Sequence, residues 1–277
     1  MTHGHVTGEA LIQHPGVAKI SFTGSEAVGK HIARVGSATL KHVSLELGGK
    51  NPQIILEDAD LDAAAATAAI AGFFYSGQVC TAGSRVMVQR SVLDRILPKL
   101  EEAAKAQVLG HGLAQTSTMG PLISGSQRQR VAAFVTEAQA SGAQVLFGSD
   151  LPQDSGDGYF YRPTVVVENN DQARVVREEI FGPVIIVQVF DTIDEVIQRA
   201  NETPYGLAAG IWTRDSAKVH HLASRIKAGT VWVNTYNQFD AAAPFGGYKQ
   251  SGYGRDHGRE GIEKFLETKT VWVNTAM

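Results

Sequence analysis

The single cysteine of this 277-residue chain, Cys80, lies in the segment YSGQVCTAGSR. Its neighbours Gly77, Thr81 and Gly83 are small, so the backbone can approach a ligand and a substrate can reach the sulfur. A thiol with a pKa of about 8.5 is only a few per cent thiolate at neutral pH, so a nucleophilic cysteine needs a nearby base or positive dipole. The pattern predicts either a nucleophile or a small buried structural residue.

Glu46 is the candidate base and lies in the segment SLELGGKNP. It stands inside the apolar run Val43–Leu47 and is followed closely by Gly48 and Gly49. A carboxylate beside an apolar wall has a raised pKa, which suits general-base catalysis near neutral pH. The alternative is a glutamate on an edge strand that points into solvent.

The segment FTGSEAVGK closes an expected strand with Gly24 and Ser25 and then opens a helix. Free backbone N–H groups and the positive end of the helix dipole would suit a pyrophosphate. Because Gly-Ser is also a common start of a helix, an ordinary N-cap is the competing interpretation.

The segment REEIFGPV places Glu178 and Glu179 before Phe181. A carboxylate can accept hydrogen bonds from both hydroxyls of a ribose, and an adjacent aromatic ring can pack on a flat ring. The alternative is a charged helix end followed by a Gly-Pro stop.

The glycine-rich segment Pro244–Asp256 carries Lys249 and Arg255. Such a loop can clamp a substrate or fix a reversal of the chain, and composition does not decide between these two roles.

Composition excludes several classes of function. The 25 Lys and Arg against 28 Asp and Glu give a net charge of −3, so no overall basic field indicates nucleic acid or an anionic membrane as partner. Apolar stretches such as Ala63–Tyr75 are shorter than the roughly 18 residues of a membrane span. The first residues lack the basic and apolar regions of a secretory signal, and we expect a cytoplasmic protein.

Metal and disulfide chemistry are not expected. One cysteine permits neither an internal disulfide nor a CxxC motif. The nine histidines show no HExxH spacing, so we predict no metal site.

The elements that would position these residues alternate between strands and helices. Apolar alternation predicts strands at 17–22, 42–47, 53–56, 85–89, 143–147, 164–167, 184–190, 207–212 and 230–234. Helical periodicity predicts helices at 60–75, 92–107, 126–140, 193–200 and 216–226. This order favours an α/β fold with a largely parallel sheet covered on both faces.

Both ends of the chain indicate assembly. The hexapeptide TVWVNT occurs at Thr230–Thr235 and again at Thr270–Thr275, where an apolar strand needs a partner edge in this chain or another. No strand precedes Gly4 and Gly8, so the sequence reads as though it starts within a nucleotide-binding domain.

Taken in order, the motifs FTGSEAVG, LELGGKNP, GQVCTAGSR, EEIFGPV and PFGGYKQSGYGRD resemble the successive signatures of the NAD(P)-dependent aldehyde dehydrogenase superfamily. The resemblance runs from Gly4 to the C-terminus. It implies that Cys80 adds to an aldehyde to give a thiohemiacetal and that its N–H supplies half of the oxyanion hole. A hydride then leaves to the nicotinamide, and Glu46 activates the water that hydrolyses the thioester.

The resemblance also implies a cofactor site. Gly24 and Ser25 would contact the pyrophosphate, Glu179 the nicotinamide ribose, and Phe181 would pack near the nicotinamide. The cofactor is NAD or NADP, with NAD as the default.

Domains follow from the same resemblance. Residues 1–47 would be a remnant of the dinucleotide-binding domain, so that this Rossmann-like cofactor domain is incomplete. Residues 48–250 would form the catalytic domain, 251–268 a return segment, and 269–277 an oligomerisation strand in a homo-oligomer, a dimer or tetramer. The family's PWNFP segment and the first strands of its cofactor domain have no counterpart here.

An apolar and aromatic approach is expected beside the cysteine. Its predicted lining is Phe73, Val79, Phe239 and Phe245, which resembles that of members taking aromatic or medium-chain aldehydes. Two alternatives stay open at this stage: a hydrolase that uses Cys80 and Glu46 without a cofactor, and a non-catalytic, oligomerising remnant.

Overall fold

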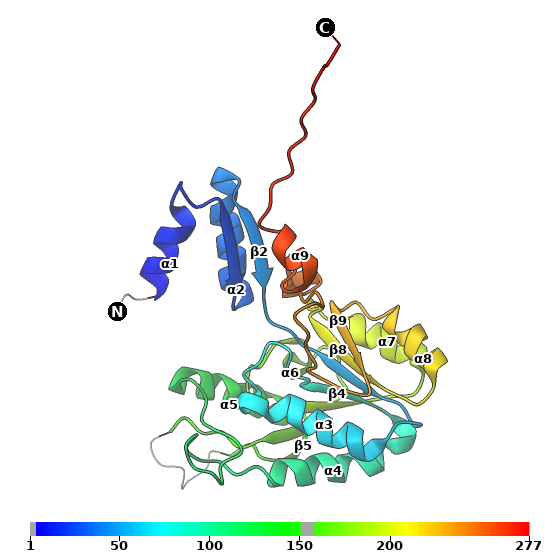
Figure 1. Cartoon of the computed structure of the whole chain (residues 1–277). Helices are drawn as coiled ribbons and strands as arrows, with labels where there is room; N and C mark the ends of the chain where they lie inside the picture. The colour runs from blue at the N-terminus through cyan, green and yellow to red at the C-terminus, as the bar shows by residue number, and fades with distance from the viewer. Residues whose placement is uncertain (1–3, 151–157, 277) are drawn as a thin grey trace.

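The computed structural model describes residues 4–150 and 158–276, and within them the strands form two sheets (Figure 1). The small sheet has the order β1-β2-β10 and the large sheet the order β5-β6-β7-β4-β3-β8-β9. The strands are β1 Lys19–Thr23, β2 His42–Glu46, β3 Pro52–Ile55, β4 Arg85–Gln89, β5 Gln144–Phe147, β6 Thr164–Val167, β7 Val184–Phe190, β8 Ala208–Trp212, β9 Thr230–Val233 and β10 Gly252–Tyr253.

Helices separate most of these strands. They are α1 Gly4–Gln13, α2 Glu26–Gly36, α3 Leu61–Phe73, α4 Leu93–Lys105, α5 Gly125–Ala140, α6 Arg174–Arg177, α7 Ile193–Asn201, α8 Ser216–Ala223 and α9 Gly258–Glu263. Short 3₁₀ turns lie at η1 Ser37–Thr39, η2 Phe74–Gly77, η3 Arg90–Val92 and η4 Lys249–Ser251. The helix starts follow the N-cap rule, since the side chains of Ser25, Asp60, Ser124, Thr192 and Asp215 each accept a hydrogen bond from the first turn.

The large sheet confirms the predicted parallel α/β architecture. Its ladders are parallel except where the edge strand β5 pairs with β6. The interior strand β7 is buried along its whole length because helices cover both faces. Helices α3 and α4 pack on one face, against residues such as Val86 and Ile185, while α7 and α8 pack on the other, against residues such as Met87 and Ile211.

The predicted elements lie within about two residues of the observed ones, except at the end of α8, and three predicted helices extend too far. The helix predicted to reach Tyr75 ends at Phe73, because Tyr75 and Ser76 adopt positive φ angles of 48° and 58°. The helices predicted to reach Gln107 and Ile226 end at Lys105 and Ala223. The short elements α6, α9 and β10 were not predicted, since four to six residues, or two for a strand, carry too little periodicity.

The two copies of TVWVNT have different structures. Thr230–Val233 forms β9 at the edge of the large sheet, next to β8. The second copy is extended and pairs with no strand in the described part of the chain; Figure 1 shows this tail running away from both sheets. Trp272 is 93% exposed there, whereas Trp232 is buried. The same six residues therefore form a paired strand only where a neighbouring strand is available.

The two sheets are joined through Ser251, which is fully buried. Its hydroxyl donates to the Gly48 carbonyl (2.7 Å) and accepts from the Gly206 N–H (3.0 Å). Its own carbonyl accepts from the Leu47 N–H at 3.0 Å. Ser251 thus links the segment between β2 and β3 to the residues just before β8.

Replacing Ser251 with alanine should lower the free energy of unfolding by roughly 1–3 kcal/mol, because two buried backbone groups lose their partner. Urea unfolding followed by circular dichroism measures this change. Ser224→Ala is the control, since Ser224 is exposed and its hydroxyl bonds only to the His221 carbonyl. Equal stability of the two variants would show that the Ser251 hydroxyl does not join the sheets.

Candidate active site

Cys80 lies on a short loop that is held in place by two buried side chains. The Asn51 amide donates to the carbonyls of Cys80 and Ala82, at 2.9 Å each. The Tyr236 hydroxyl, from the segment after β9, donates to the Thr81 carbonyl at 3.0 Å. Cys80 itself is only partly buried. The loop is therefore fixed while the thiol remains accessible.

The electrostatic environment of this thiol is the opposite of the one expected. Burial raises the pKa of Cys80, and the negative charges of Glu179 and Glu46 raise it further, while the N–H groups of Thr81 and Cys80 oppose the change. The resting group is consequently a protonated thiol at neutral pH. The glycine pair after Glu46 lies between the other two residues: Glu179 accepts from the Gly49 N–H, and a Cβ at Gly49 would lie 2.8 Å from the Cys80 carbonyl.

Glu46 ends β2, the central strand of the small sheet, where it pairs with Thr23 of β1 and Gly252 of β10. It is 8% exposed, and its Oε2 atom has no hydrogen-bond partner among residues 4–150 and 158–276. The alternative of an outward-pointing glutamate on an edge strand is therefore wrong.

Burial raises the pKa of Glu46 to about 8, with a further contribution from the charge of Asp256, while Arg255 and Lys264 oppose it. Such a group exchanges a proton readily near neutral pH. It has the properties of a general base that becomes fully active in mildly alkaline solution.

Glu179 packs directly on the glycine pair that follows Glu46. Its Oε1 atom accepts a hydrogen bond from the Gly49 N–H at 3.2 Å. A Cβ atom at Gly48 would lie 2.1 Å from Oε2, so only glycine permits this approach. Burial raises the pKa of Glu179, whereas the Gly49 N–H and the charges of Lys50 and Arg130 lower it.

Two side chains of α5 fix the backbone around Glu179. The Gln127 amide donates to the carbonyls of Ile180 (3.0 Å) and Phe181 (2.7 Å), and Arg130 donates to the Glu179 carbonyl at 3.0 Å. Phe181 is exposed and has a positive φ of 56°. Sequence analysis did not identify Gln127 and Arg130. Their spacing of three residues places them on one helix face, but no local pattern tells which loop that face meets.

The start of α2 combines a helix N-terminus with a groove. Ser25 is the N-cap and accepts from the Val28 N–H at 3.4 Å, while the Gly24 N–H donates to the Glu46 carbonyl at 3.0 Å. An open groove of about 840 Å³ lies between α1, β1 and α2, with residues such as Ile20 and Ile32 in its lining. The N-cap interpretation is thus correct, and it is compatible with an anion held beside a mainly apolar groove.

Aromatic side chains lead away from the Cys80 loop. Trp232 contacts both Tyr236 and Phe239, with ring centroids 4.6 and 5.6 Å apart, and Phe239 contacts Phe245 at 5.4 Å. Phe239, between Trp232 and Phe245, is 53% exposed, so the row is open to solvent at its middle. Val79, next to the cysteine, is partly buried.

The prediction that Phe73 lines the approach is wrong. Phe73 is 3% exposed and packs in the core between α3, α4 and the large sheet. Phe74 is 48% exposed and packs against Tyr75, with ring centroids 4.0 Å apart. Because α3 ends between the two residues, neighbouring phenylalanines point to different environments.

The side chains of Lys249 and Arg255 donate hydrogen bonds to backbone carbonyls. The Lys249 ammonium donates to the carbonyls of Asn201 (2.8 Å) and Thr203 (3.1 Å), and Arg255 donates to the carbonyls of Gly247 (3.1 Å) and Gly254 (2.7 Å). These contacts fix the reversal of the glycine-rich segment.

The described residues contain no group of three or more His, Cys, Asp or Glu placed to hold a metal ion. None of their helices is long and apolar enough to cross a membrane.

Comparisons with known proteins agree with this geometry. The model of the aldehyde dehydrogenase family matches residues 1–271. A betaine aldehyde dehydrogenase of Rhizobium johnstonii is 42% identical over 268 residues, which cover 96% of this chain and 55% of that protein. The chain therefore spans about half the length of this curated relative.

Solved structures give the same result. The NAD+ complex of aldehyde dehydrogenase from Bacillus cereus superimposes with a TM-score of 0.96 at 45% identity, covering 99% of this chain and 55% of that one. The betaine aldehyde dehydrogenase of Staphylococcus aureus in complex with NAD+ gives 0.94 at 41% identity, covering 97% and 54%.

The protonated state of Cys80 predicts how its reactivity depends on pH. Alkylation by iodoacetamide should accelerate about tenfold per pH unit from pH 7 to beyond pH 9, because only the thiolate reacts. Glu179→Gln should move the midpoint of this profile to lower pH, since it removes a negative charge beside the thiol. Mass spectrometry of the labelled chain measures the rates. A profile already flat at pH 7 would contradict the assigned environment.

Proposed function

Because the chain belongs to the aldehyde dehydrogenase family, we propose that it oxidises an aldehyde to a carboxylic acid with transfer of a hydride to NAD+. The observation that carries the proposal is the convergence of three groups: an accessible thiol at Cys80, a buried base at Glu46 and a carboxylate at Glu179. They come from three distant parts of the sequence, and the charges of both carboxylates raise the pKa of Cys80.

The first step is addition of the Cys80 sulfur to the aldehyde carbon. The thiol proton passes to the Glu46 carboxylate as the carbon–sulfur bond forms, and the Cys80 N–H donates to the developing oxyanion. This gives a thiohemiacetal on Cys80. Bound NAD+ supplies the acceptor for the hydride that leaves the former aldehyde carbon, and the product on the enzyme is a thioester.

The second step is hydrolysis of that thioester. Glu46 first releases the thiol proton to bulk water. As a carboxylate it then takes a proton from the attacking water, and the oxygen bonds to the thioester carbon. Collapse of the tetrahedral intermediate breaks the carbon–sulfur bond, releases the carboxylic acid and restores the Cys80 thiol with the proton that Glu46 had taken. A base with a pKa of about 8 suits both proton transfers.

The residues present fit a dinucleotide. The first turn of α2, which follows Gly24 and Ser25, offers backbone N–H groups for the pyrophosphate, although the Gly24 N–H itself is held by the Glu46 carbonyl. The neighbouring groove offers apolar contacts for a flat base. Glu179 can accept the two hydroxyls of a ribose, and Phe181 is exposed beside it. NAD is favoured over NADP because the matched structures of Bacillus cereus and Staphylococcus aureus are NAD+ complexes.

The substrate we propose is an aromatic or medium-chain aldehyde. The row from Tyr236 through Phe239 to Phe245 gives an apolar approach beside the Cys80 loop, and Val79 and Phe74 complete it. Relatives named betaine aldehyde dehydrogenase make a cationic aldehyde the natural comparison, because aromatic rings also attract quaternary ammonium groups.

Domain boundaries and assembly complete the proposal. A boundary near residues 47 and 48 agrees with the passage from β2 to β3, and a return segment from 251 agrees with β10 adding to the small sheet. We propose that the exposed segment 269–276 pairs with a second copy of the chain in a dimer or tetramer, because its Val-Trp-Val pattern is that of a buried strand.

The direct test of function is formation of reduced nicotinamide from NAD over aromatic, aliphatic and trimethylammonium aldehydes. Turnover should require the thiol, so Cys80→Ser is the blank. Faster reaction of aromatic and medium-chain members would support the substrate class. A folded chain that shows no Cys80-dependent turnover with any aldehyde would refute the proposed activity, and ester hydrolysis indifferent to NAD would favour the hydrolase alternative.

Replacement of Glu46 with glutamine should slow thioester hydrolysis by about 10²–10⁴-fold, because the water loses its base. In the unmodified chain, hydrolysis should rise with pH and level off above pH 8, since a base acts only when deprotonated and the pKa of Glu46 is about 8. Single-turnover kinetics and the mass of acylated Cys80 measure both effects. Unchanged deacylation in Glu46→Gln would assign the base elsewhere.

A further inference from the structure

Lys50 is a buried cationic residue to which the mechanism above gives no task. It follows the Gly48–Gly49 pair and is 1% exposed. Its Nζ atom has no hydrogen-bond partner within residues 4–150 and 158–276. Burying an ammonium group without a partner is costly, so such a lysine requires a nearby negative charge, a water molecule or loss of its proton.

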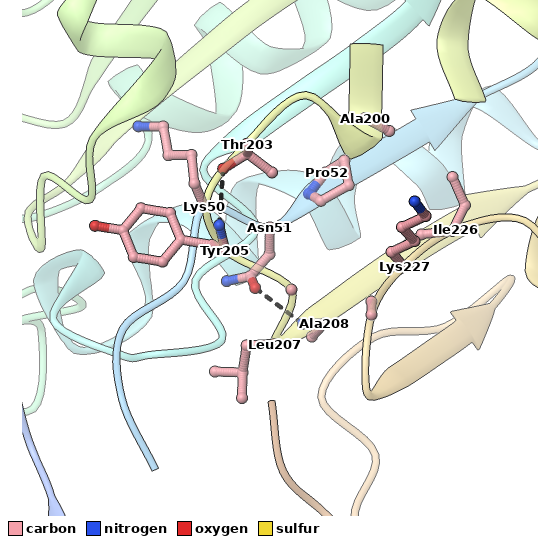
Figure 2. A pocket seen from close by; sticks show the side chains of 12 residues that line it. Lys50, Asn51, Pro52, Ala200, Thr203, Tyr205, Leu207, Ala208, Ile226 and Lys227 are labelled. Atoms are coloured by element: carbon pink, nitrogen blue, oxygen red, sulfur yellow. Dashed lines mark hydrogen bonds between the residues drawn. The ribbon is translucent and has the colours of Figure 1, made fainter. Parts of the chain in front are cut away.

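The surroundings of Lys50 provide room for one water molecule. A cavity of about 10 Å³ is lined by Lys50 together with residues such as Asn51, Thr203 and Tyr205. In Figure 2 the Lys50 ammonium and the Tyr205 hydroxyl extend to the same side, away from Pro52, Ile226 and Lys227, which line the rest of this cavity. The Asn51 side chain is already engaged, because its oxygen accepts from the Ala208 N–H at 3.1 Å. The main hydrogen-bond partner of the Asn51 oxygen is thus Ala208 and not Lys50.

Glu179 is the carboxylate that packs against the backbone just before Lys50. Its two oxygens lie on Gly48 and Gly49, the residues immediately before Lys50. The other cation that acts on Glu179 is Arg130, whose side chain is 46% exposed and lies 3.9 Å from Glu178. Solvent weakens the effect of an exposed charge, so Lys50 is the stronger buried counter-ion.

We propose that Lys50 is a positioning residue that acts through Glu179, because its ammonium group holds Glu179 as a carboxylate able to accept both hydroxyls of a ribose. The inference rests on the proposed function, because the ribose is part of the proposed cofactor. The charge coupling itself concerns only residues of this chain.

Charged groups from several elements face Lys50. Burial and the positive charge of Arg85 on β4 lower its pKa to about 7, whereas Glu179 and Glu178 raise it. Tyr205 lies in the same cavity, and burial together with the charges of Glu26 and Glu179 raises its pKa to about 12, so it stays neutral.

The sign of the coupling follows. Below about pH 7 Lys50 is charged and keeps Glu179 ionised to lower pH than burial alone would allow. Without that charge, Glu179 takes up a proton at higher pH. A protonated carboxyl has lost part of its capacity to accept, and it holds a ribose less well.

The test is a pH titration of the Glu179 carboxyl carbon by NMR in chain labelled with ¹³C-glutamate, with Glu179→Gln to assign the signal. Lys50→Met should raise the midpoint of Glu179 by about one pH unit or more, as expected for loss of a nearby opposite charge. Lys227→Met is the matched control, because Lys227 lines the same cavity from an exposed position and should leave the midpoint unchanged. Lys50→Arg, which keeps the charge, should restore it.

The unmodified chain gives a second reading should Lys50→Met fail to fold. Its Glu179 signal should show an additional inflection near pH 7, where Lys50 loses its proton. A single-step titration of Glu179 in the unmodified chain, or an unchanged midpoint in folded Lys50→Met, would overturn the inference.

Nucleotide binding separates this inference from the proposed function. Lys50→Met should weaken NAD binding by about tenfold at pH 6 and little at pH 8, and it should add nothing in a Glu179→Gln background. If the unmodified chain binds no NAD at either pH, the proposed function fails for this chain while the NMR titration still decides the charge coupling. Equal weakening at both pH values would refute action through Glu179 and indicate a purely structural role.

Discussion

The whole site depends on how the chain crosses from the small sheet to the large one. Residues 46–51 are buried throughout, so each of their polar groups needs a partner inside the protein. Ser251 satisfies the Gly48 carbonyl, and Glu179 satisfies the Gly49 N–H. Because the crossing has no side chain at Gly48, a carboxylate can occupy the space where a Cβ would stand. Glu46 and Lys50 therefore lie on one short stretch of backbone, and Glu179 packs against it.

Burial also controls the protons of this site. Both Cys80 and Glu46 have raised pKa values, because a partly dry environment disfavours every negative charge placed in it. The resting protein consequently holds Cys80 as a thiol, near a carboxyl group whose pKa is also raised. A permanent thiolate would need a cation, and the described residues place none beside the sulfur.

Sequence was sufficient for the strands of the large sheet, and it singled out Cys80 and Glu46 as candidates whose catalytic roles are proposals. A short run rich in β-branched residues such as Val184–Phe190 favours a buried strand, and a carboxylate inside an apolar run, such as Glu46, is unusual enough to mark a candidate site. It was insufficient where tertiary contacts decide. Gln127 resembles any polar residue of an amphipathic helix, and the environment of Phe73 depends on where α3 ends. Two identical TVWVNT segments differ in structure for the same reason.

The contacts that build the site join residues far apart in sequence. Glu179 meets Gly49 across 130 positions, Asn51 meets Ala208 across 157, and Ser251 meets Gly48 across 203. Contacts of such separation form late during folding, because long loops must close first. A nascent or partly folded chain thus carries Cys80 without its neighbouring carboxylates, as an ordinary solvent-exposed thiol open to oxidation. Completed folding partly buries the Cys80 sulfur and places carboxylates that keep it protonated. Oxidative damage should therefore fall mainly on newly made or heat-loosened molecules.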